Sequence, residues 1–156
     1  EYDLEKSLAF LNQGPDDDGR KKADWVQIRQ ELLPELAGLL DRPDPGTQEP
    51  PGQVARALSL SLKQSRAPDM LPDVLSMIRL FLRDLLLLGV DSALVVNQDF
   101  SARMQQIHRQ AKPEALFGWM EALFETEQRL LSNSSPRLTL DRFFLKLALN
   151  PENAAR

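Results

Sequence analysis

The sequence contains no cysteine and a single histidine among its 156 residues. Without cysteine the chain forms no disulfide and no thiolate metal site, and this composition fits a reducing compartment. The lone histidine, His108, excludes zinc motifs that place two histidines on one helix. None of the seven glycines falls in the G-x-x-x-x-G-K-[ST] frame of a phosphate-binding loop. We therefore expect no metal and no cofactor.

Recognisable catalytic patterns are equally scarce. No serine lies in a G-x-S-x-G turn. The acidic stretch PDDDG at residues 15–19 lacks the alternation and the closing glutamate of a calcium loop. His108 lies among polar and basic residues, which favours a solvated side chain over a catalytic one. We expect a protein that is not an enzyme.

Excess positive charge is also missing. The 19 basic and 23 acidic residues give a net charge of -4. A protein that holds nucleic acid through its overall charge is typically basic. The composition therefore does not indicate a protein that binds nucleic acid through bulk positive charge.

One apolar run, RLFLRDLLLLGVD at residues 79–91, suggests a membrane span until its charges are considered. Arg79, Arg83 and Asp84 interrupt it, and each such residue near the centre of a spanning helix costs about 2.5–3.5 kcal/mol. Together they outweigh what the leucines gain. The run predicts a helix of a water-exposed protein, without membrane contact.

Apolar residues recur at helical spacing along the chain, and no convincing alternating strand pattern is present. The sequence predicts an all-α protein, a single helical bundle of about six to seven helices that covers residues 1–156 as one domain. The expected helices are, in order, about residues 4–11, 23–40, 53–64, 69–88, 100–111, 113–131 and 136–149.

Proline, glycine and short polar residues punctuate these segments. RPDPGTQEPPG at residues 42–52 is expected to be a flexible, non-helical loop. Pro34 lies inside a predicted helix and indicates a kink or a restart near Leu33. Pro113 and Pro136 suit first helical turns, while Asp99 and Ser135 are candidate N-caps. We expect Gly89 to end the fourth helix.

Two segments carry more apolar residues than one buried face needs. Beside its main stripe, the segment at 69–88 has Met77, Leu80 and Leu87 on another side. The segment at 113–131 has Phe117, Phe124 and Leu131 at steps of seven. A helix that is apolar around most of its circumference must be covered around most of it. A central core helix explains this pattern, and so does contact with a neighbouring subunit; both interpretations stay open here.

The second half of the sequence resembles a known family. IRLFLRDLLLL, a turn to NQD, two further helices and the closing LLSNSSPRLTLDRFFLKLA follow in order. They resemble the C-terminal helical domain of the clamp-loader subunits of bacterial DNA polymerase III, most of all the delta-prime members. Arg83-Asp84 match the family's arginine-aspartate pair before a leucine run. The N-x-N-P-R-L-x-L-[ED] turn is matched at Asn133 and at residues 136–141, with serine in place of the second asparagine.

The resemblance covers residues 70–149 and implies a specific role. In that family this domain is a helical bundle, the collar, that joins the subunits of a loader which places the sliding clamp on primed DNA. The delta-prime subunit is regarded as a stator that does not hydrolyse ATP. The family's nucleotide-binding domains are missing here, so we expect the chain to be the C-terminal part of a longer protein. Gamma/tau shares the same bundle and stays an alternative, as does a stand-alone helical adaptor.

The partners implied are the gamma/tau and delta subunits, in the cytoplasm of a bacterium, while the isolated domain can be monomeric because these partners are other chains. A charged pair in a leucine run suits a helix that borders a subunit contact, where charges fix register. A helix rim in water explains the pair as well. The candidate interface residues are Leu80, Arg83, Asp84, Leu87, Asn133, Arg137 and Leu138.

Overall fold

The computed structural model describes residues 18–41 and 50–149. This part of the chain holds six α-helices and no strand, which confirms the all-α prediction. The expected helix at residues 4–11 lies outside the described residues. The helices are α2 (Asp18–Leu40), α3 (Pro50–Ser65), α4 (Leu71–Leu87), α5 (Ser101–Gln110), α6 (Pro113–Leu131) and α7 (Pro136–Ala148), with 3₁₀ turns η1 (Pro68–Met70), η2 (Ser92–Leu94) and η3 (Gln98–Phe100).

Prolines begin several helices, as their chemistry favours. Pro113 opens α6 and Pro136 opens α7, where the missing backbone N–H has no helical partner to lose. The same rule corrects one expectation. Residues 50–52 were expected in a non-helical loop, but α3 begins at Pro50. Residues 42–49 lie outside the described part of the chain.

Pro34 does not interrupt α2, so the expected restart near Leu33 is wrong. Proline inside a helix costs about 3 kcal/mol. Buried side chains stand on both sides of it, among them Leu32, Leu36 and Ala37, each at most 1% exposed. Burying a leucine fully is worth about 1.5–3 kcal/mol. Packing on either side of Pro34 therefore holds the helix together.

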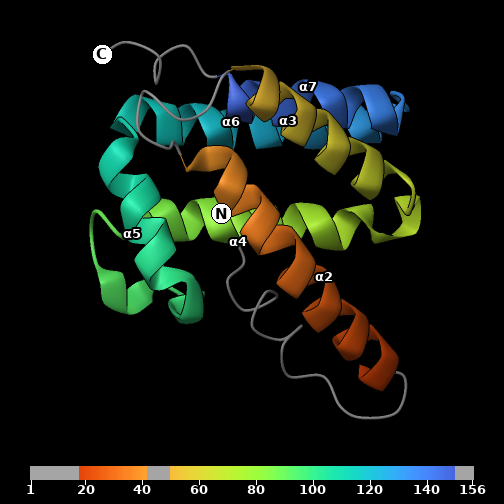
Figure 1. Ribbon diagram of the computed structural model, residues 1–156. Helices are drawn as coiled ribbons and strands as arrows, with labels where there is room; N and C mark the ends of the chain where they lie inside the picture. The colour runs from red at the N-terminus through yellow and green to blue at the C-terminus, as the bar shows by residue number, and fades with distance from the viewer. Residues whose placement is uncertain (1–17, 42–49, 150–156) are drawn as a thin grey trace.

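Helix α4 is the centre of the bundle (Figure 1). It packs against α2, α3, α5 and α6. Its buried residues lie on more than one side of the helix, with Leu75 and Leu82 on one side and Met77 and Asp84 on another. The central-helix interpretation of its double stripe is thereby confirmed for Met77. No helix within the described ranges is long and apolar enough to cross a membrane.

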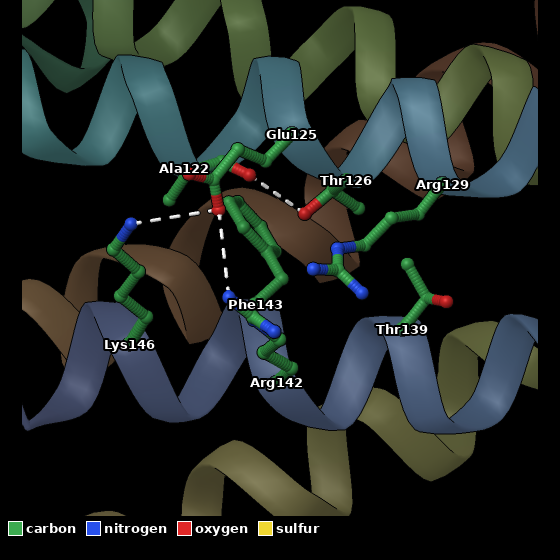
Figure 2. Close-up of a pocket in the computed structure, with 8 residues that line it drawn as sticks. All are labelled: Ala122, Glu125, Thr126, Arg129, Thr139, Arg142, Phe143 and Lys146. Atoms are coloured by element: carbon green, nitrogen blue, oxygen red, sulfur yellow. Dashed lines mark hydrogen bonds and ion pairs between the residues drawn. The ribbon is translucent and has the colours of Figure 1, made fainter.

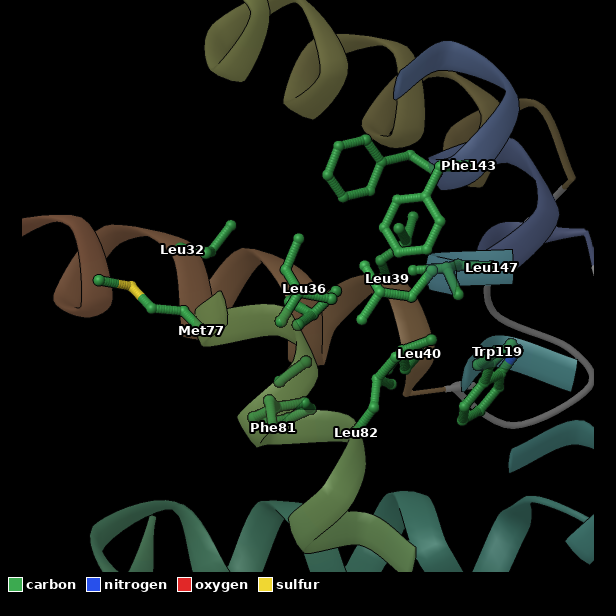
Figure 3. Packing of buried hydrophobic residues seen from close by; sticks show 14 of the residues in the cluster. Leu32, Leu36, Leu39, Leu40, Met77, Phe81, Leu82, Trp119, Phe143 and Leu147 are labelled. Carbon is green, nitrogen blue, oxygen red and sulfur yellow. The ribbon is translucent and has the colours of Figure 1, made fainter. Parts of the chain in front are cut away.

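Side chains from α2, α4, α6 and α7 meet in one core (Figure 3). Trp119 of α6 and Phe81 of α4 are at most 1% exposed. Phe143 and Phe144 of α7 stack in a tilted arrangement with ring centroids 5.1 Å apart. Helix α7 also packs along α3 and α6 and contacts α2, so it ties the end of the described chain to its beginning.

This core predicts unequal effects for two phenylalanines. Phe81→Ala should lower the free energy of unfolding by about 3–5 kcal/mol, because it leaves a cavity among fully buried neighbours. Phe117→Ala is the matched control. It removes the same atoms from a side chain that is 64% exposed, and its effect should stay within about 0.5 kcal/mol. Urea unfolding followed by circular dichroism measures both, and equal losses would contradict the placement of these residues.

Candidate interaction surface

The predicted Arg83–Asp84 pair lies in the last two turns of α4, and its two members differ sharply in exposure. The side chain of Asp84 is completely buried, whereas that of Arg83 is 36% exposed. Arg83 Nη1 donates to Asp84 Oδ1 at 3.1 Å. The other oxygen, Oδ2, accepts from the backbone N–H groups of Val96 and Asn97 at 3.1 and 2.8 Å, and from the Asn97 side-chain amide at 2.8 Å. Every donor needed to hold a buried carboxylate is therefore present.

Asn97 links this hydrogen-bond network to α2. Its side-chain oxygen accepts two hydrogen bonds from Arg29, from Nε at 3.2 Å and from Nη2 at 2.9 Å. Arg29 also donates to both oxygens of Asp99 at 3.0 and 2.6 Å. Its guanidinium lies 5.8 Å from the ring centroid of Phe100, within cation–π range. The loop between α4 and α5 is thus fixed from two sides, by α4 and by α2.

Two sequence-based expectations change here. Asp99 does not cap α5, which begins after the 3₁₀ turn with Phe100 at the N-cap. Its carboxylate instead binds Arg29, and the hydrogen bond from that guanidinium is the main reason why the pKa of Asp99 is lowered. Ser135 does occupy the N-cap position of α7, but its side chain makes no capping hydrogen bond.

Asp84 is also placed differently from the prediction, which put it on a subunit contact. A side chain without exposed surface cannot reach a partner, and its oxygens are engaged within the chain. Arg83 keeps partial exposure beside it. Leu80 and Leu87 are half-buried, and Leu87 packs against the core. Of the α4 residues in the predicted interface, only Asp84 is thereby excluded from direct contact with a partner.

The second predicted group, at the turn into α7, lies on the surface. Asn133 has a φ of 58°, a left-handed conformation that asparagine tolerates better than most residues. Arg137 bonds Asp141 one turn later at 2.9 Å. Leu138 is 69% exposed. Leu138 offers apolar surface at this turn.

Three apolar side chains on α6 are exposed in a row. Phe117, Phe124 and Leu131 are 64%, 62% and 78% exposed. Seven residues advance a helix by about 10.5 Å, so the row extends about 21 Å along α6. Leaving large apolar groups in water gives up about 1.5–3 kcal/mol each relative to burial. We call these three residues the α6 stripe.

The two edges of the α6 stripe are unlike. On one edge Met120 packs against the core and Glu127 is ion-paired with Arg79 of α4. On the other edge Glu114 and Glu121 are exposed. Neither forms an ion pair with a basic residue of the described chain. The stripe therefore has one closed edge and one open acidic edge.

Beside Phe124 the surface is hollowed. A shallow, open hollow of about 300 Å³ is lined by Phe124, Gln128, Arg129, Ser132 and Ser134, together with Glu125. A second pocket, between α6 and α7, holds about 10 Å³, which is room for about one water. Figure 2 shows Glu125 there between Arg142 and Lys146, at 3.8 and 3.7 Å. Neither resembles the deep, largely apolar pocket of a small-molecule site.

His108, the residue weighed for a catalytic role, has a structural partner. His108 is half-buried rather than solvated, and its Nδ1 lies 2.9 Å from the carbonyl oxygen of Leu85 near the end of α4. Its ring also packs on Gly89, the predicted stop, where an added Cβ would come within 3.1 Å of it. Across residues 18–41 and 50–149, no three histidine, aspartate or glutamate side chains are grouped to hold a metal.

No family model, curated protein or solved structure matches this chain.

The buried carboxylate predicts a strong, position-specific effect. Asp84→Ala should lower the free energy of unfolding by about 3–5 kcal/mol, because it leaves the N–H groups of Val96 and Asn97 and the charge of Arg83 without their acceptor. Asp69→Ala, at an exposed position of η1, is the control and should change it by about 0.5 kcal/mol or less. Urea unfolding at neutral pH measures both; similar stabilities would argue against the network.

The Arg29–Asp99 contact predicts a pH dependence. Because the pKa of Asp99 is lowered in the folded state, its contribution is complete above the unfolded value of about 3.9 and is lost as pH falls through the lower folded value. Asp99 is 58% exposed, so the contribution is about 0.2–1 kcal/mol. Asp99→Asn should be less stable than the parent at pH 7, with a gap that narrows below pH 4. A gap independent of pH would contradict this account.

Proposed function

We propose that this domain is a non-catalytic oligomerisation domain, the collar domain of a clamp-loader delta-prime subunit of bacterial DNA polymerase III. It helps assemble the loader that places the sliding clamp on primed DNA. The observation that carries the proposal is the α6 stripe. Three large apolar side chains stay exposed on a helix whose other face is packed, a feature typical of surfaces that meet another protein.

The resemblance and the fold supply further support. The two motifs that carry the resemblance fall at structurally demanding points, Asp84 inside the central helix and Asn133 in the left-handed turn before α7. A helical bundle is the architecture that the resemblance implies. In this proposal the partners are the gamma/tau and delta subunits, DNA is reached through the complex, and the protein works in the bacterial cytoplasm without ATP chemistry of its own.

Two alternative functions are compatible with the same structure. The gamma/tau subunit has a similar C-terminal bundle, and a preceding nucleotide-binding domain with an intact phosphate loop would favour it. A stand-alone helical adaptor would use the α6 stripe to bind a helical ligand. Binding of such a ligand, together with no association with any loader subunit, would favour the adaptor.

Reconstitution tests the proposal. Co-expressed with the gamma/tau and delta subunits of its own bacterium, the protein should co-purify in one complex that buries at least about 1,200 Å² per stable interface. Removing residues 70–149 should abolish association, whereas removing residues 1–17 should preserve it. Size-exclusion chromatography with light scattering gives the stoichiometry. Assembly that persists without residues 70–149 would contradict the proposed role.

A further inference from the structure

We propose that the α6 stripe docks an amphipathic helix of another protein, one whose apolar row is flanked by lysine or arginine. This inference deepens the proposed function, and rests on it in taking the domain to be one that joins other chains. It concerns the chemistry of the partner surface that Phe117, Phe124 and Leu131 accept.

The spacing of the stripe points to a helix as the occupant. A row that repeats every seven residues drifts by only about 20° per step around an α-helix, so it stays on one side of α6 over its whole length. Another helix that crosses at about 20° keeps such a row in contact along both axes. A flat sheet or a compact loop would meet only part of a row about 21 Å long.

The charge along the open edge points to a basic partner. Glu114 lies one turn before Phe117, and Glu121 lies between Phe117 and Phe124, so both follow the stripe. Both are exposed, and neither has an ion pair within the described chain. The single basic residue of α6, Arg129, lines the hollow beside Phe124, but its side chain extends away from the stripe toward α7 (Figure 2). Lysine or arginine beside the partner's apolar row would complement this edge.

The same charges argue against a second copy of this chain. In a two-fold antiparallel pairing of α6 helices through the stripe, like edges lie on the same side. Glu114 and Glu121 of one copy would then meet those of the other, and like charges at short range are repulsive. In a parallel two-fold pairing the acidic edge meets the Met120–Glu127 edge, which offers no free positive charge. The chain as a whole is also negative, at -4.

Two synthetic helical peptides of the length of α6 serve as probes. Both carry the same heptad row of leucines; one has lysines on both sides of the row and the other has glutamates. Fluorescence anisotropy at low and at physiological salt should show the lysine peptide binding about tenfold or more tighter than the glutamate peptide. That preference should weaken as salt screens the exposed charges.

Matched variants locate the binding. Phe124→Ser should weaken the lysine peptide about tenfold or more, whereas Leu94→Ser, at another exposed apolar residue, should leave its affinity unchanged. Glu114→Gln with Glu121→Gln should remove the preference between the peptides. Glu35→Gln with Asp69→Asn removes the same two charges elsewhere on exposed positions and should preserve it.

Several results would overturn the inference: equal binding of the two peptides, no binding of either, or binding that is indifferent to Phe124→Ser. Self-association of the chain alone that Phe124→Ser abolishes would do so too, by assigning the stripe to a second copy. Failure of this inference can be distinguished from failure of the proposed function. If loader subunits assemble but the lysine peptide does not bind, only this inference falls. If the peptide binds as described but no loader subunit associates, only the clamp-loader role falls.

Discussion

The hydrogen bonds to the completely buried carboxylate of Asp84 are the constraint on which the loop between α4 and α5 depends. The same loop also contacts α2. A charge without water must be matched by donors, because desolvation otherwise costs several kcal/mol. The donors come from Arg83 and from the loop at residues 96–97. The loop can therefore take few other conformations while Asp84 stays charged and buried. Through Asn97 and Arg29 the same constraint fixes the position of α2.

Burial is distributed unequally between α4 and α6, and this difference separates core from surface. Both helices carry apolar residues on more than one side. On α4 they are covered, because α2, α3, α5 and α6 surround it. Helix α6 packs mainly on α4 and α7, and within the described chain the α6 stripe on its opposite side stays exposed. A helix with apolar residues around most of its circumference can therefore be either covered by other helices or left partly exposed. Its position in the bundle decides which of the two occurs.

Helix positions followed from the sequence far better than polar contacts did. Prolines and apolar spacing are local signals, so α6 was predicted with its observed bounds at residues 113–131. The partner of Asp99 is Arg29, 70 positions away, and no local signal points to it. The sequence shows Asp84 as a charged residue within a leucine run. Whether such a residue is a buried hydrogen-bond acceptor or a surface charge depends on residues that approach it only in the folded structure. The α6 stripe was visible as a step of seven, yet its exposure depended on packing.

The rigid core and the exposed α6 stripe suit the proposed role in association with other protein chains, for a physical reason. Association costs the freedom of both partners, and a surface that is already ordered loses less on binding. The α6 stripe lies on a helix whose other face is held by Trp119 and Leu123, each about 1% exposed, so its side chains are presented in a fixed row before any partner arrives. In the proposed docking, the charged edge selects which partner fits and in which register. In the docking that we propose, affinity comes from the apolar row, and selectivity comes from Glu114 and Glu121.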